Sequence, residues 1–137
     1  DEAYQASTTS KQNVVEPTVS DAITLAARQV AETVNANCIV TYTTSGSTTL
    51  RAARERPTVP ILCVTSSLST ARRMAIAWGI HSVHIDQEER FSTVVKRAVD
   101  IAETQGFASS GDHIVITAGV PMGKSGSTNV LRIERIP

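Results

Sequence analysis

Two segments rich in glycine and hydroxyl side chains are the part of this sequence best suited to chemistry. The first consists of Thr43, Thr44, Ser45, Gly46, Ser47 and Thr48. The second spans residues 117–129 and includes Gly123, Lys124, Ser125 and Gly126. Because neither segment carries an acidic residue, their backbone N–H groups and hydroxyls are available to an anion. Together they predict a phosphate-sized pocket in which Lys124 is the only cation supplied by either segment.

Neither segment matches a familiar nucleotide-binding or nucleophile motif. Gly123-Lys124-Ser125 lacks the first glycine of a Walker A loop, and the dinucleotide fingerprint is missing. No Gly-x-Ser-x-Gly turn occurs, so a catalytic triad is not indicated. His81 and His84 are three apart in a strand-like run, which points them to opposite faces. We therefore expect no catalytic residues and no metal ligands in this chain.

The bulk composition narrows the class of protein. With 13 basic and 13 acidic residues, the formal net charge is zero, which argues against a general nucleic-acid binder. No apolar run approaches the roughly 20 residues that a membrane span requires. Cys38 and Cys63 lie in apolar strand-like runs, so we expect buried reduced thiols, with a disulfide as the minor alternative.

The pattern of apolar residues predicts alternating helices and strands. Helices are expected at residues 20–36, 48–54, 70–78 and 90–105, and strands at 38–42, 61–64, 82–85, 114–116 and 130–136. Thr18 or Ser20 is expected to cap the first helix, and Ser69 the third. Residues 1–17 are polar and aperiodic, so they are interpreted as a linker or arm cut from a longer chain, followed by one domain at 18–137.

This order predicts an α/β domain with three layers. Its sheet has five strands, four parallel and the last antiparallel, because the connection from the fourth strand to the fifth is too short for a parallel crossover. The fourth strand is expected beside the first, on the side away from the second. Both hydroxyl-rich segments then leave the carboxyl edge of the sheet at the switch point, where ligands bind in such folds.

Several arginines could form a basic patch. They are Arg51, Arg54, Arg56, Arg72 and Arg73. Helix-surface arginines paired with Glu55 or with solvent are the commoner arrangement.

The anion site predicted at the two loops has a simple alternative. Many glycine- and serine-rich loops bind no ligand, so these two loops could be purely structural.

The first segment and the end of the chain together resemble the C-terminal domain of pyruvate kinases of bacterial type. The resemblance rests on residues 22–57, 60–70 and 114–132, above all on the pattern Thr-x-Ser-Gly-x-Thr and on the ending Ile-Thr-Ala-Gly-x-Pro-x-Gly-x-x-Gly-x-Thr-Asn-x-x-Arg. It implies a cytoplasmic glycolytic enzyme that transfers phosphoryl from phosphoenolpyruvate to ADP with Mg²⁺ and often K⁺. The chemistry would lie in a catalytic β/α barrel of the same polypeptide, so this chain alone is expected to be inactive.

The resemblance also implies a role for the two segments. Residues 43–48 match a phosphate-cradling loop and residues 119–128 match an effector loop, in a domain that binds phosphorylated small molecules and helps to form a tetramer. With Lys124 as the lone loop cation, one phosphate is favoured over two, and an unregulated enzyme remains an alternative. A free-standing α/β module that binds small molecules is a competing hypothesis, and an independent phosphate-handling enzyme ranks lowest.

Overall fold

A computed structural model describes residues 18–77, 79–87, 90–120 and 128–137 of the chain. The predicted arm at 1–17 and Trp78 lie outside these residues. The elements follow the order α1 (Val19–Thr33), β2 (Cys38–Tyr42), α2 (Ser47–Arg54), β3 (Ile61–Thr65), α3 (Leu68–Ala75), β4 (Ile80–His84), α4 (Phe91–Thr104), β5 (His113–Ala118) and β6 (Val130–Arg135). This is the predicted α/β succession.

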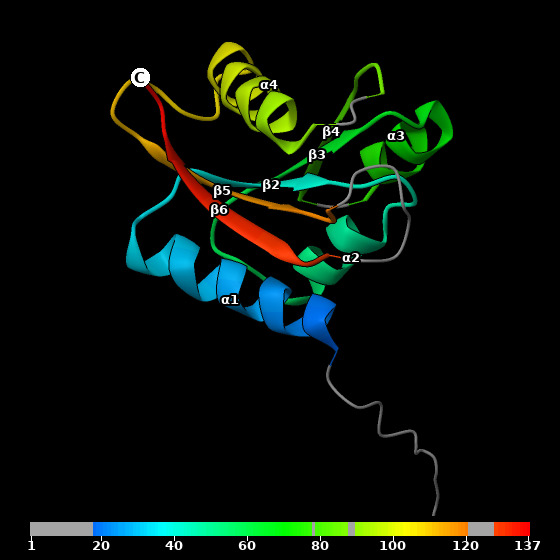
Figure 1. Cartoon of the computed structure of the whole chain (residues 1–137), viewed down its shortest axis with the longest axis horizontal. Helices are drawn as coiled ribbons and strands as arrows, with labels where there is room; N and C mark the ends of the chain where they lie inside the picture. Colours follow the sequence, from blue (N-terminus) through cyan, green and yellow to red (C-terminus); the bar gives the residue numbers. More distant parts are fainter. Residues whose placement is uncertain (1–17, 78, 88–89, 121–127) are drawn as a thin grey trace, which may run out of the picture.

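The five strands form one sheet in the order β4-β3-β2-β5-β6. The first four strands in the chain are parallel, and β6 pairs antiparallel with β5. β2 lies between β3 and β5, so the switch point falls between β2 and β5, as the sequence predicts. Figure 1 shows α1 below the sheet and α4 above it, which makes the three layers.

The two faces of the sheet are filled by different side chains. On one face, α4 packs Val94, Ala98 and Ile101 onto alternate residues of β2 and β5 in the larger apolar cluster. On the other face, Ala27 and Ala31 of α1 pack against the sheet in the smaller cluster. The central strands are buried on both faces, which explains why they are continuous apolar runs.

The start of α1 is fixed by a capping box. Thr18 Oγ1 accepts the N–H of Asp21 at 3.1 Å, and the Asp21 carboxylate accepts the Thr18 N–H at 3.0 Å. Thr18 is therefore the cap, and Ser20 lies inside the helix, where it is 7% exposed. Because Ser20 is inside the helix and not its cap, its hydroxyl is available to the candidate site described below.

Both predicted ends of the third helix and the predicted start of the following strand are wrong. The cap of α3 is Ser67, whose side chain accepts the N–H of Thr70, so this helix begins two residues before the predicted position. It also ends at Ala75, because Gly79, with φ of +79°, serves the turn into β4 rather than closing the helix. The Gly79 carbonyl accepts the N–H of Ile61 at 3.3 Å, which starts β4 at Ile80 instead of residue 82.

Candidate anion site at the carboxyl edge of the sheet

Both hydroxyl-rich segments leave the sheet at the same edge. The first connects β2 to α2, and the second connects β5 to β6. β2 and β5 are neighbouring parallel strands with Thr41 in register with Thr117, so their exiting segments start side by side. The predicted convergence of the two stems therefore follows from the sheet order.

A direct hydrogen bond joins the two segments. Thr48 Oγ1 and Thr128 Oγ1 lie 2.6 Å apart although they are 80 residues apart in the chain, and both are almost completely buried. The N–H of Thr128 donates to Ser20 Oγ at 3.0 Å. The end of the second segment is thus attached both to α2 and to the first turn of α1.

The first segment has a conformation that requires glycine at its centre. Gly46 has φ of +93°, in the left-handed region that side-chain-bearing residues rarely adopt. A Cβ there would lie 3.1 Å from Cε of Met74, which is closer than ordinary contact. The Gly46 N–H donates to Thr43 Oγ1 at 3.0 Å, and the Ser47 N–H donates to Ser45 Oγ at 3.3 Å.

Helix α3 holds the outer side of the first segment. Thr70 Oγ1 donates to the carbonyl of Thr44 at 2.8 Å, and Arg73 Nη2 donates to the carbonyl of Ser45 at 3.0 Å. The same Nη2 donates to Thr70 Oγ1 at 3.0 Å. The sequence alone presents Arg73 as one of several surface arginines. Its place in the chain could have indicated its role. Helix α3 follows β3, the neighbour of β2, and so begins at the same edge of the sheet as the first segment.

The stem of the second segment is closed by its asparagine. Asn129 Nδ2 donates to the carbonyl of Val120 at 2.7 Å, and Asn129 Oδ1 accepts the Val120 N–H at 2.8 Å. The predicted anion contacts Gly123, Lys124, Ser125 and Gly126 lie outside the described residues. The structure therefore locates the two ends of this segment beside the first segment, and the role of its central residues stays a prediction.

An ion pair connects the helices beneath the site. Arg51 Nε of α2 lies 3.2 Å from Oδ1 of Asp21 on α1. Hydrogen bonds from the backbone and side chain of Thr18, followed by the Arg51 charge, lower the pKa of Asp21. Glu55 is a predicted partner for the surface arginines named above. In the structure it pairs instead with Arg28 of α1, at 3.5 Å.

The cysteines and histidines have structural surroundings. Burial raises the pKa of Cys38 to about 12 and also raises that of Cys63, so both are neutral thiols at physiological pH. Both are free cysteines, as expected. His81 bonds Gln105 and packs against Phe107, and His84 bonds the Ser66 carbonyl. Within the described ranges, no group of three or more His, Cys, Asp or Glu could hold a metal ion, and no helix is long and apolar enough to cross a membrane.

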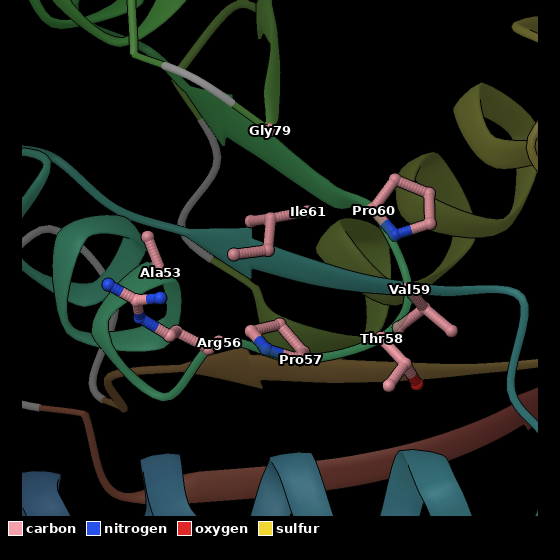
Figure 2. A pocket seen from close by; sticks show the side chains of 8 residues that line it. All are labelled: Ala53, Arg56, Pro57, Thr58, Val59, Pro60, Ile61 and Gly79. Atoms are coloured by element: carbon pink, nitrogen blue, oxygen red, sulfur yellow. The ribbon is translucent and has the colours of Figure 1, made fainter.

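A hollow of about 600 Å³ lies at the amino ends of β3 and β4, at the opposite edge of the sheet from the first hydroxyl-rich segment. Figure 2 shows its lining, which comes from the end of α2, the Pro57–Pro60 connection and the turn before β4. The residues are Ala53, Arg56, Pro57, Thr58, Val59, Pro60, Ile61 and Gly79. The sequence indicates the two prolines only as a stop to the preceding helix and does not predict this hollow.

The fold and the site define an α/β domain with two hydroxyl-rich loops joined at the switch point of a mixed sheet. Residues 21–134 match the family model "Pyruvate kinase, alpha/beta domain". The chain therefore belongs to the pyruvate kinase family and corresponds to its C-terminal α/β domain.

Individual relatives agree with this assignment. The chain is 42% identical to a pyruvate kinase of Methylorubrum extorquens over 86% of its own length and 25% of that protein. It is 38% identical to a pyruvate kinase of Geobacillus stearothermophilus over 87% of its length and 20% of the relative. The solved pyruvate kinase of Cryptosporidium parvum superposes with a TM-score of 0.80 and 29% identity, covering 90% of this chain and 24% of that one. The chain thus spans a quarter or less of the length of these relatives.

Proposed function

We propose that the two joined loops bind the phosphate group of a small-molecule effector and that the domain regulates a pyruvate kinase. The observation that carries the proposal is the buried contact between Thr48 and Thr128, which brings both loops to one place. In the complete enzyme, a catalytic β/α barrel of the same polypeptide would transfer phosphoryl from phosphoenolpyruvate to ADP. The cytoplasmic location implied by the resemblance belongs to the same proposal.

The chemistry of the described residues supports an anion at the first loop. Its side chains are hydroxyls without acidic groups, and it leads directly into α2. The N-cap of α2 is Gly46, which makes no side-chain hydrogen bond to the first turn, and the positive end of the helix dipole lies there. The 3.3 Å bond from the Ser47 N–H to Ser45 Oγ is long, so a phosphate oxygen is a better acceptor for that N–H. Arg73 adds a positive charge beside the loop.

Metal ions are proposed only for the complete enzyme. Mg²⁺ and K⁺ are what the resemblance implies for phosphoryl transfer, and a divalent ion would neutralise charge on the transferred group. The described part of this chain contains no clustered set of carboxylate, imidazole or thiolate ligands. We therefore assign both ions to the barrel and derive no step through a metal in this domain.

Self-association is the second proposed role. β6 is the last strand in the sheet order, and Ile133 on it is 43% exposed, so the strand can pair with another chain. Such an edge is a candidate contact between subunits in a tetramer of the complete enzyme. Sedimentation of wild type and of Ile133→Lys tests this role, and an unchanged mass in both would count against β6 as the contact.

Calorimetric titration with inorganic phosphate, a sugar monophosphate, a sugar bisphosphate and a nucleotide tests the effector site. We expect at least one phosphorylated compound to bind and to raise the melting temperature by mass action. Ser45→Asp should abolish both effects, because it places a carboxylate where the anion binds. Ser110→Asp, an exposed position after α4, is the control and should bind as wild type does.

The two competing hypotheses predict different results. A free-standing binding module would bind ligand in the same titration, but no β/α barrel would be encoded upstream of Asp1. An independent phosphate-handling enzyme would turn over substrate as the isolated chain. If no phosphorylated compound binds at millimolar concentration, the effector proposal fails and the assembly role is left as the function of the domain.

A further inference from the structure

We infer that Arg73 on α3 is the residue that both positions the first loop and makes it selective for a doubly charged phosphate ester. This inference rests on the proposed effector site and names a residue and a ligand class for it. Arg73 lies 28 positions from Ser45 in the chain, yet its Nη2 donates to the Ser45 carbonyl at 3.0 Å. A side chain from a different helix therefore holds the backbone of the loop.

Two side chains of α3 bind consecutive carbonyls of the loop. Thr70 and Arg73 are three positions apart and therefore lie on one face of the helix. Thr70 Oγ1 donates to the carbonyl of Thr44, and Arg73 donates to the carbonyl of Ser45. Arg73 also donates to Thr70 Oγ1, so the two side chains act on the loop as one hydrogen-bonded unit.

These contacts determine where the loop N–H groups point. In a trans peptide the carbonyl and the N–H of the same unit point in opposite directions. The Thr44 carbonyl shares its peptide with the Ser45 N–H, and the Ser45 carbonyl shares its peptide with the Gly46 N–H. Because α3 binds both carbonyls, both N–H groups face away from α3, and that of Gly46 donates to Thr43 Oγ1. Thr70 thereby orients the Ser45 N–H, and Arg73 orients the Gly46 N–H.

The guanidinium also supplies charge at the rim of the loop. It has five N–H donors, and the two hydrogen bonds recorded among the described residues both use Nη2. Arg73 is exposed, and its charge lies beside the loop on the side that faces α3. A phosphate ester carries close to two negative charges at pH 7, so the Arg73 charge attracts it more strongly than it attracts a singly charged anion. This gives the first loop a cation that does not depend on Lys124.

Arg72 is a matched control for this role. It is adjacent, exposed and identical in charge, but it is turned about a quarter of the way around the helix from Arg73. No hydrogen bond joins Arg72 to the first loop within the described part of the chain. Arg72→Gln therefore removes the same net charge from α3 without changing the contacts to Ser45.

The test compares Arg73→Gln, Arg73→Lys and Arg72→Gln in titrations with glucose 6-phosphate at low and moderate salt. We expect Arg73→Gln to weaken binding about tenfold and to lessen its salt dependence, because the positive charge beside the loop and the charged hydrogen bond to the Ser45 carbonyl are lost. Arg73→Lys should recover part of the affinity, since it keeps the charge but not the planar fork. Arg72→Gln should stay within about twofold of wild type.

Amide exchange of Gly46 separates this inference from the proposed function. Arg73→Gln should speed exchange of the Gly46 N–H, whereas Arg72→Gln should not, and neither measurement requires a ligand. If wild type binds phosphate esters and Arg73→Gln binds them equally well with unchanged exchange, the inference is overturned and the effector site stands. If wild type binds no phosphate ester, both the effector site and the selectivity assigned to Arg73 are wrong. The exchange rate of the Gly46 N–H then decides by itself whether Arg73 positions the loop.

Discussion

Thr41 Oγ1 and Thr49 Oγ1 lie 2.7 Å apart, and both side chains are completely buried between β2 and α2. A hydrogen bond between two buried hydroxyls fixes how α2 sits on the sheet. Since α2 begins at the end of the first loop, this pair also fixes the direction in which that loop leaves β2.

Replacing either of these threonines by valine should reveal the pairing. Thr41→Val or Thr49→Val alone leaves a buried hydroxyl without its partner and should lower the free energy of unfolding by about 1 to 2 kcal/mol. The double valine variant removes both hydroxyls while keeping the shape, so it should cost less than the sum of the two single changes. Urea unfolding of all four proteins measures the coupling. Additive effects would show that the two hydroxyls do not stabilise each other.

Gly46→Ala should destabilise the chain by strain and by crowding. The left-handed backbone alone costs roughly 1 kcal/mol for alanine, and the new methyl group would also press on Met74. Gly106→Ala is the matched control, because Gly106 has φ of +82° with nothing within 4 Å of the place that a methyl group would take. We expect a larger loss of unfolding free energy at 46 than at 106, together with weaker phosphate binding only at 46. Equal losses would mean that Met74 moves aside without cost.

Asp21 should make stability depend on pH in the acidic range. Its folded-state pKa is lowered from 3.8, first by hydrogen bonds from Thr18 and then by Arg51. The stabilisation is present above 3.8 and disappears as the pH falls through the lower pKa of the folded state. Asp21→Asn should therefore be less stable than wild type at neutral pH, and the difference should shrink on acidification. Asp100→Asn on the exposed side of α4 provides the comparison, and parallel curves for the two variants would contradict the role of Asp21.

Cys38 should resist alkylation in the folded state. Burial raises its pKa to about 12, so very little thiolate is present at pH 8, and the side chain has no exposed surface. We expect iodoacetamide to leave the native chain unmodified and to label Cys38 and Cys63 once urea unfolds it. Mass spectrometry after timed exposure provides the measurement. Fast labelling of the native protein would indicate that β2 opens readily.

Much of the architecture could be predicted from periodicity alone. The face of α4 formed by Val94, Val95, Ala98, Ile101 and Ala102 is buried as the three-to-four spacing indicates. The sheet order and the antiparallel last strand also agree with the prediction, because they follow from connection length and handedness rather than from single residues. Long amphipathic helices and continuous apolar strands are the signals that a sequence carries most clearly.

The missed features depend on contacts between distant residues. Ser67 and Ser69 are both acceptable caps for α3, and the hydrogen bond from the Thr70 N–H to Ser67 Oγ identifies Ser67 as the cap. The reach of Arg73 to Ser45 depends on the angle at which α3 packs beside the first loop, which no local pattern encodes. The hollow beside Pro57 likewise arises from the spacing between elements, so the sequence shows its residues without showing their arrangement.

The bond from the Thr128 N–H to Ser20 Oγ closes a span of 108 residues. Ser20 is in the first turn of the first helix, and Thr128 precedes the last strand, so the candidate pocket exists only after the two ends of the domain have come together. Loop closure over such a distance is entropically expensive and comes late in folding. In the proposed role, ligand affinity would consequently report finished folding of this domain. A chain that has collapsed but has not yet docked its first helix would have its sheet but not the proposed anion site.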